Sequence, residues 1–216
     1  MKNNTTKLDE LEVDTIYKDN RNHFFKLFYD EHSDSPRSEF SENIATILTW
    51  EDDYDSPDEN PDTIEEFAKK HGVDVSQEWH FDDLLSAMRE EGYYAVPVYA
   101  LHHGASHYSI DDFYDKWDSG VVGIAFCKRE DSLIDNDDYF RKVIDREVKE
   151  YDAWLNGEIY GITLLSPKEE TLDESWGYIE PEEGRAEMLK HMLYCVGVDI
   201  QDEYQPAARE VAVVLK

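Results

Sequence analysis

The sequence has few basic residues. Lys and Arg number 21 among 216 residues against 51 Asp and Glu, which gives a formal net charge of −30 at pH 7. Such an excess of negative charge argues against direct binding of DNA or RNA, whose phosphates it repels. A small domain normally carries a net charge of about 2–8 in magnitude, and self-repulsion on a larger scale lowers stability. We therefore expect the charge to be maintained for a function.

Long apolar runs are absent, and the chain has only two cysteines. No stretch of 18 apolar residues occurs, so the sequence predicts no transmembrane helix and no membrane partner. Residues 1–14 are polar and lack the apolar core of a signal peptide. We therefore expect a cytoplasmic protein, in which Cys127 and Cys195 are buried thiols in a reducing compartment.

Several motifs of enzyme chemistry are also missing. There is no P-loop, no G-x-G-x-x-G and no C-x-x-C pair, and we expect no enzyme activity, no cofactor and no metal. His102, His103 and His107 lie close to Asp111, and imidazole and carboxylate groups are good ligands for zinc or manganese. The spacing matches neither H-x-x-x-H nor H-E-x-x-H, which favours a polar loop with structural hydrogen bonds. A metal-dependent enzyme that uses the 102–112 loop is therefore the last of three functional hypotheses, and the other two follow from the charge.

The apolar content predicts a folded core, since 40% of the residues are hydrophobic and 13% aromatic. Strands are predicted at residues 24–29, 43–50, 93–101, 121–127, 159–165, 175–180 and 211–215. Helices are predicted at residues 63–70, 82–91, 139–155 and 183–194. This order indicates an α+β fold, with a mixed or mostly antiparallel sheet and helices mainly on one face. We expect a loose N-terminal segment, residues 1–20, and one domain, residues 21–216.

The strongest local pattern is a strand, a helix and a second strand between residues 121 and 165. Apolar residues recur from Phe140 to Leu155 at intervals of three and four, which is typical of a helix with one buried face. Asn156 and Gly157 end this helix, because Gly accepts the left-handed conformation at a helix C-terminus. The pattern defines a scaffold and names no chemistry.

Acidic residues are concentrated in EDDYDSPDENPD, residues 51–62, where seven of the twelve are Asp or Glu. One interpretation is a solvated acidic loop. The other is an array of charges that imitates the phosphates of a nucleic acid, which carries one negative charge per roughly 1.7 Å of duplex axis.

Three segments suggest a relationship. KWDSGVVGIAF, EVKEYDAWLNGEIYGI and ESWGYIE resemble motifs of a family of small acidic proteins without an assigned function, which occur in phages, plasmids and other mobile elements. The resemblance covers residues 24–180 and implies a mobile-element accessory protein, a class that includes inhibitors of host defence. The family tends to have Cys before the Trp of the last motif, where this chain has Ser175 before Trp176, so no thiol or metal role is carried over.

Charge and resemblance together predict a non-enzymatic cytoplasmic protein that binds a basic nucleic-acid-binding protein, such as a restriction or CRISPR component. It would block the DNA or RNA groove of that protein by imitating nucleic acid. The alternative is an acidic or halophilic accessory protein without mimicry, although halophilic surfaces usually lack Lys and more than half of the basic residues here are Lys. The predicted partner-binding residues are Glu51, Asp52, Asp53, Asp55, Asp58, Glu59, Glu169, Glu170, Asp173, Glu182 and Glu183.

Overall fold

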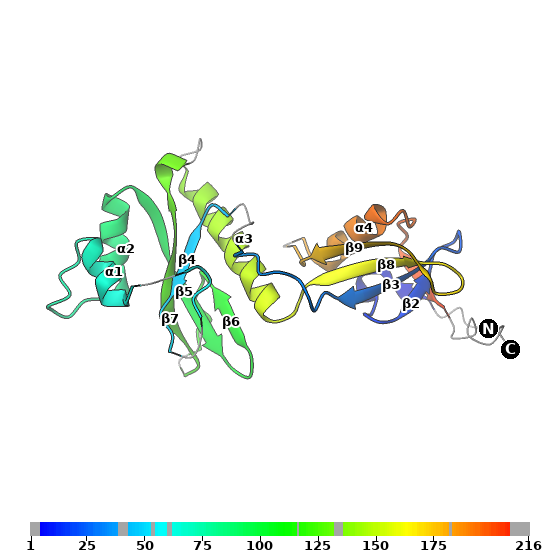
Figure 1. Cartoon of the computed structure of the whole chain (residues 1–216), viewed down its shortest axis with the longest axis horizontal. Coiled ribbons are helices and arrows are strands. Elements are labelled where there is room, and N and C mark those ends of the chain that lie inside the picture. The colour runs from blue at the N-terminus through cyan, green and yellow to red at the C-terminus, as the bar shows by residue number, and fades with distance from the viewer. Residues whose placement is uncertain are drawn as a thin grey trace. The chain divides into compact units, whose positions relative to one another are not determined.

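The chain forms two compact units. The computed structural model describes residues 5–38, 43–52, 55–59, 62–115, 117–131, 136–181 and 183–207. Unit 1 consists of residues 1–33 and 157–216, and unit 2 consists of residues 34–156. Each unit has its own antiparallel sheet and its own helices (Figure 1). The predicted α+β class with mostly antiparallel strands is confirmed, and the segment 21–216, predicted as one domain, is divided between the two units.

Unit 2 contains a four-stranded sheet in the order β4-β7-β5-β6. Neighbouring strands are antiparallel throughout. The strands are β4 (Thr46–Thr49), β5 (Tyr93–His102), β6 (Ser106–Ser109) and β7 (Ser119–Lys128). Two short 3-10 helices occur in the described chain, η1 (Leu8–Glu10) in unit 1 and η2 (Arg129–Asp131) after β7.

Helices cover both faces of this sheet, whereas the sequence predicted helices mainly on one face. The helices are α1 (Ile64–Lys70), α2 (Phe81–Glu90) and α3 (Asp137–Leu155). Ala125 of β7 packs in the cluster that includes α3, and the adjacent Ile124 packs in the cluster that includes α1 and α2 (Figure 1). Strands buried on both faces are apolar without alternation, which is the pattern of residues 121–127.

Two features of unit 2 differ from the predicted elements. Pro97 indicated an edge strand or a bulge, and β5 lies between β7 and β6 with a register shift between Val98 and Tyr99. Because β6 begins its pairing only at Tyr99, the β6 side of β5 has no strand neighbour at Pro97. The first helix was predicted at residues 63–70 but begins at Ile64, because Thr63 is the N-cap and forms a capping box with Glu66.

Unit 1 contains a six-stranded sheet in the order β1-β10-β2-β3-β8-β9. Figure 1 labels β2, β3, β8 and β9 of this sheet. The strands are β1 (Thr6–Lys7), β2 (Ile16–Lys18), β3 (Phe24–Tyr29), β8 (Tyr160–Leu165), β9 (Thr171–Tyr178) and β10 (Glu203–Pro206). Helix α4 (Arg185–Cys195) packs its buried side chains against one face of this sheet.

The N-terminal segment belongs to this sheet. Residues 5–20, predicted to be loose, include β1 and β2, and Leu11 and Tyr17 are buried in the core of unit 1. Their apolar side chains are too widely spaced in a polar segment for a local pattern to indicate burial. The strand predicted at residues 211–215 lies outside the described residues. Within the described ranges, no helix combines the length and the apolar composition needed to cross a bilayer.

A buried carboxylate organises the turn between β2 and β3. Oδ1 of Asp19 accepts hydrogen bonds from the amides of Arg21 (2.8 Å) and His23 (2.8 Å). Oδ2 accepts the amide of Asp199 (3.3 Å) and lies 2.9 Å from Nδ1 of His23. Burial alone would raise the pKa of Asp19, but the amide of His23 and the other donors more than offset it. The pKa is therefore lowered.

Asp19 is expected to make the stability of unit 1 depend on acid pH. A carboxyl with a lowered folded-state pKa stabilises the fold above its unfolded pKa of about 3.9, and this contribution is lost as the pH falls through the folded-state pKa. Asp19→Asn should therefore lower the free energy of unfolding at pH 7 by about 1–3 kcal/mol. The difference between parent and variant should shrink below about pH 3. Urea denaturation followed by circular dichroism at both pH values measures it, and an equal difference at both would contradict a structural role for the ionised form.

Candidate functional site

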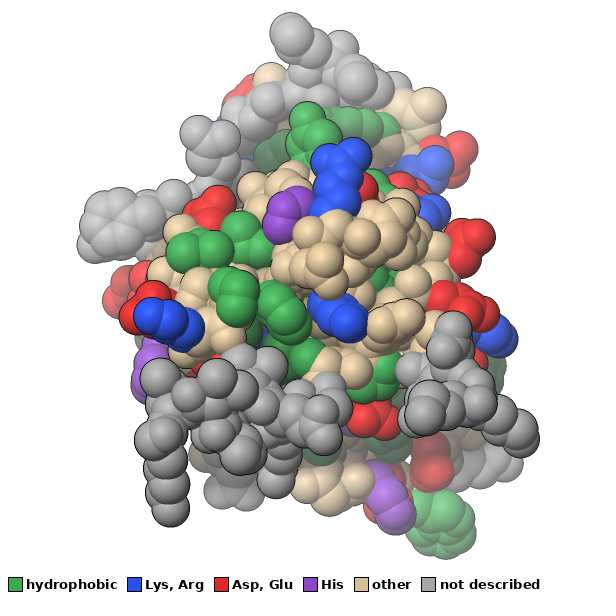
Figure 2. All heavy atoms as spheres, turned by 90° about the vertical axis from the view of Figure 1, so that its right-hand side faces the viewer, with side chains coloured by type: hydrophobic (Ala, Val, Ile, Leu, Met, Phe, Trp, Pro, Cys, Tyr) green, Lys and Arg blue, Asp and Glu red, His purple; other side chains and the backbone are tan. Residues whose placement is uncertain are grey.

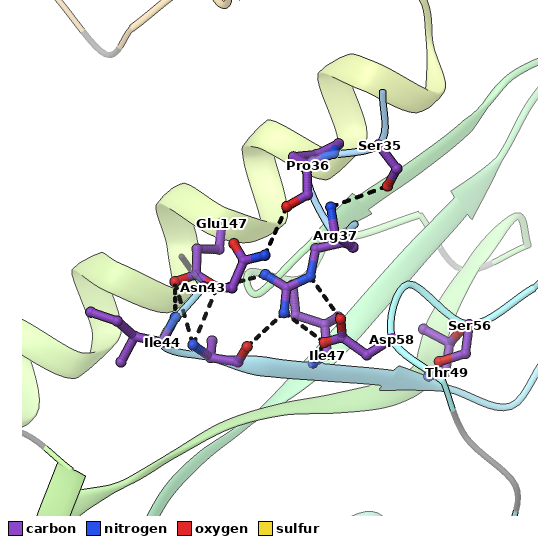
Figure 3. Close-up of polar contacts among 11 residues, drawn as sticks. Ser35, Pro36, Arg37, Asn43, Ile44, Ile47, Thr49, Ser56, Asp58 and Glu147 are labelled. Carbon is purple, nitrogen blue, oxygen red and sulfur yellow. Dashed lines mark hydrogen bonds and ion pairs between the residues drawn. The ribbon is translucent and has the colours of Figure 1, made fainter. Parts of the chain in front are cut away.

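A buried arginine lies at the centre of a polar network in unit 2 (Figure 3). The side chain of Arg37 is only 3% exposed. Its guanidinium donates to both oxygens of Asp58, from Nε at 3.0 Å and from Nη2 at 2.6 Å, and Nη1 donates to Glu147 at 2.6 Å. Burial by itself lowers the pKa of Arg37, but the hydrogen bonds and charges of the two carboxylates outweigh burial and raise it. The planar guanidinium suits this bidentate pairing.

Glu147 is the second anion of this network. It lies on the buried face of α3, and its side chain is 1% exposed. Besides Arg37, it accepts the amides of Ile44 (2.9 Å) and Ala45 (3.2 and 3.3 Å) (Figure 3). Glu147 was not among the predicted site residues. A carboxylate three residues after the buried Ile144 and four after the buried Val143 was the signal that could have indicated it, because that position faces the core.

Asp58 is half-buried and engaged within unit 2, so it does not act as a free surface charge. Its carboxylate pairs with Arg37, and Oδ2 also accepts the amide of Ile47 at 2.6 Å. The amide of Asp58 in turn donates to the carbonyl of Ile47 at 3.0 Å. The prediction that Asp58 binds a partner is therefore not supported by its contacts, since its charge is already balanced by a buried cation.

Glu51 is likewise held within unit 2. Its side chain is 10% exposed, lies 2.6 Å from Nε2 of His102 and accepts a hydrogen bond from the hydroxyl of Tyr108 at 2.8 Å. Tyr108 is buried against Tyr151 of α3. Glu51 therefore connects the segment after β4 to the hairpin of β5 and β6, and it is a poor candidate for a partner-binding charge.

Ser106, His102 and Glu51 form a chain of contacts that resembles a catalytic triad. In that comparison Ser106 is the nucleophile, His102 the base and Glu51 the orienting acid. Nδ1 of His102 lies 3.0 Å from the hydroxyl of Ser106, and Nε2 lies 2.6 Å from Glu51. However, His102 and Ser106 are directly opposite in the register of the hairpin, which accounts for their contact without a substrate. Acyl transfer also requires two donors aimed at a developing oxyanion, and this chain of three side chains contains no such pair.

The other two histidines of the hairpin have separate partners. His103 lies 3.0 Å from Asp118, and His107 lies 3.4 Å from Asp152 of α3. Within the described residues, no group of three His, Cys, Asp or Glu side chains has the arrangement of a metal site. The 102–112 segment, predicted as a loop, contains the strand β6. These contacts favour the structural interpretation of the three histidines.

Three of the predicted acidic residues between 51 and 59 are exposed, and we call them the loop acids: Asp52, Asp55 and Glu59. The negative charge of this segment also affects the pKa of the Tyr151 phenol. Burial raises the pKa of Tyr151, and the carboxylates of Asp55, Glu51 and Asp58 raise it further. Asp53, the remaining predicted residue of this segment, lies outside the described residues.

The second predicted acidic cluster lies around the hairpin of β8 and β9 in unit 1. Three exposed residues, which we call the hairpin acids, are Glu169, Glu170 and Asp173. Glu183 is also exposed, and Glu182 lies outside the described residues. On the face shown in Figure 2, acidic side chains are interspersed with hydrophobic and basic ones, so negative charge does not cover that face uniformly.

The two thiols differ from each other. Cys127 is buried in β7, and burial, with a further effect of Glu147, raises its pKa to about 12. It is therefore an unreactive thiol, as the sequence predicted. Cys195 was also predicted to be buried but is exposed, as the last residue of α4.

Comparisons of the chain with family models, with curated proteins and with solved structures give no match. The resemblance to proteins of mobile elements therefore stays a prediction, and the functional argument depends on the charge and the geometry of this chain.

Proposed function

We propose that this chain is a non-enzymatic, cytoplasmic accessory protein that binds a basic protein which handles nucleic acid, and that it blocks the groove in which DNA or RNA lies. The observation that carries this proposal is the net charge of −30, together with the exposure of the loop acids and the hairpin acids. Restriction and CRISPR components are the partner class, in keeping with the resemblance to proteins of mobile elements.

The contacts of individual carboxylates refine which charges can serve this purpose. Asp58 and Glu51 are engaged within unit 2, so they contribute little to an external field. Exposed carboxylates that lie within about 8 Å of a basic groove attract it at physiological ionic strength, and this attraction is screened as salt increases. The loop acids and the hairpin acids therefore carry the proposal.

Capture followed by competition tests the proposal. The immobilised protein is incubated with lysate of its host at about 50 mM salt and washed with a 30-base-pair duplex DNA. We expect the DNA to release basic nucleic-acid-binding proteins, because both ligands compete for one groove. Captured proteins that duplex DNA does not release would contradict mimicry. Unfolding of the protein below about 1 M salt would instead favour halophilic adaptation.

Neutral variants of the two acid sets should weaken binding to a captured partner. The three loop acids are replaced by Asn or Gln in one variant, and the three hairpin acids in another. Each variant loses three charges, so we expect slower association and a weaker dependence of the association rate on salt, with little change in dissociation. Surface plasmon resonance at about 50 and 200 mM salt measures both rates.

A variant with the same change in net charge serves as the control. It carries three exposed acidic residues of α1 and α2 changed to the amides: Glu65→Gln, Asp82→Asn and Glu90→Gln. If the control slows association as much as either test variant, the partner senses only net charge and neither acid set forms a specific surface.

A further inference from the structure

Strand β9 is an exposed strand at the edge of the unit 1 sheet. In the part of the chain that the structure describes, β8 is its only strand neighbour, and β9 ends the strand order (Figure 1). Six of its eight residues are exposed, from Thr171 to Glu174 and at Trp176 and Gly177. An edge of this kind presents backbone groups to which a further strand can bind.

An aromatic side chain lies on the face of the sheet that is opposite to α4. Trp176 packs edge-to-face on Phe28 with a centroid distance of 4.5 Å, yet 49% of its surface is exposed. Phe28 extends across Gly161 of β8, where a Cβ atom would lie 2.2 Å from the phenyl ring. Glycine at position 161 is therefore necessary for Phe28 to support the indole, and the exposed indole face is held in place.

A carboxylate lies next to this indole on the same face. Glu174 is paired with Thr163 of β8, and Thr163 is paired with Lys26 of β3. These three residues form one row across the sheet. The neighbouring row on the same face contains Phe28 and Trp176. Residues two apart on a strand are about 7 Å apart and point to the same side. A cation on an added strand could therefore contact the Trp176 ring and the Glu174 carboxylate together.

The charge of the edge selects the kind of strand that can bind. Two copies of β9 placed side by side would bring Asp173 and Glu174 of each copy close to the same residues of the other, and like charges on adjacent strands are destabilising. The hairpin acids, at the start of β9 and before it, increase this repulsion. A strand with Lys or Arg at alternate positions meets no such repulsion and adds favourable pairs.

We propose that β9 is the docking edge for an extended basic segment of the partner, which adds to the sheet as a further strand and places a Lys or Arg side chain over Trp176 and beside Glu174. This inference rests on the proposed function for the class of partner. It adds the site in unit 1 and the mode of recognition, in which backbone hydrogen bonds supply affinity and the aromatic residue with its neighbouring carboxylate supplies selectivity.

Synthetic peptides test this mode directly. The probe is a seven-residue peptide with Lys and Thr in alternation, and its partner probe has the same sequence with alternate amides N-methylated, so that charge is kept and strand pairing is prevented. We expect the first peptide to bind at least about 10-fold more tightly, because only it can form the ladder of backbone hydrogen bonds. We also expect it to protect the amides of residues 171–178 from hydrogen exchange. Equal affinity of the two peptides, or no protection of β9, would overturn the proposal.

Variants of the indole and the carboxylate separate specific docking from general attraction. Trp176→Leu keeps apolar bulk on Phe28 but removes the ring, and it should weaken peptide binding by about 2- to 30-fold. Glu174→Gln should weaken it as well. Trp117→Leu is the matched control, because Trp117 is 93% exposed and belongs to unit 2. An unchanged affinity of Trp176→Leu in a variant that retains the parent circular dichroism spectrum would overturn the role of the indole.

The outcomes also separate this inference from the proposed function. Binding of the alternating peptide at β9 without any partner released by DNA would support the docking edge and contradict nucleic-acid mimicry. Release of a partner by DNA without peptide binding at β9 would support mimicry and overturn the docking edge.

Discussion

Replacement of Arg37 by Ala should lower the free energy of unfolding of unit 2 by about 3–5 kcal/mol. The change removes the cation that balances Glu147, whose side chain is 1% exposed, and it removes the bidentate partner of Asp58. A buried charge without its counter-ion is costly, and the ion pair between Arg37 and Glu147 of α3 would be lost (Figure 3). Urea denaturation followed by tryptophan fluorescence measures the loss, because Trp50, Trp79, Trp117 and Trp154 all lie in unit 2.

Two further variants make the origin of this loss testable. Arg141 pairs with Asp111 at the surface, so Arg141→Ala removes a cation of the same unit at a cost below about 1 kcal/mol. The double variant Arg37→Ala/Glu147→Gln also removes the uncompensated charge and should be more stable than Arg37→Ala alone. If the double variant is the less stable of the two, the loss arises from packing and not from the buried charge.

Gly123→Ala should destabilise unit 2 by about 3 kcal/mol or more. Gly123 lies in β7, and a Cβ atom there would be 2.0 Å from the carbonyl oxygen of Leu48 and 2.9 Å from Cα of Thr49. These are backbone atoms of β4, so relief requires that β4 separate from β7, with loss of ladder hydrogen bonds and of core contacts. The same fluorescence measurement in urea gives the size of the effect.

The matched control lies on the same strand. A Cβ atom at Gly120 of β7 meets no atom within 4 Å, so Gly120→Ala should change the free energy of unfolding by less than about 0.5 kcal/mol. Comparable losses for the two variants would indicate that alanine disfavours β7 at any position and that the approach of β4 to Gly123 is not the cause.

Elements with strong local patterns were predictable from the sequence. The spacing of Phe140, Ile144 and Val148 gave α3 nearly to its observed bounds, and the run of apolar residues in 121–127 gave most of β7. Strand β6 was missed because its four residues, SHYS, are mostly polar and carry no alternation of their own. The assignment of strands to two sheets was also missed, because β7 and β8 have similar patterns and neither pattern specifies the neighbouring strand.

The polar network of unit 2 was harder to predict than the helices. Arg37 lies in a segment of Ser, Pro and Asp, and its two anionic partners are 21 and 110 positions away in the sequence. Spacing that wide leaves no local signal, so Asp58 was interpreted by composition as a surface charge. At Asp52 and Asp173, by contrast, the acidic composition agrees with the exposure of the side chains.

The place of unit 2 within the sequence of unit 1 determines the order in which the chain can fold. Strand β3 pairs with β8 from Phe24–Leu165 to Tyr29–Tyr160, and all of unit 2 is translated between the two strands. At about 5–20 residues per second, β3 waits for roughly 7–26 s until β8 has been made. Unit 2 is complete by then, and once folded it replaces a long flexible loop, which lowers the entropy cost of bringing β3 and β8 together. During synthesis, unit 1 is therefore the last part of this protein to close.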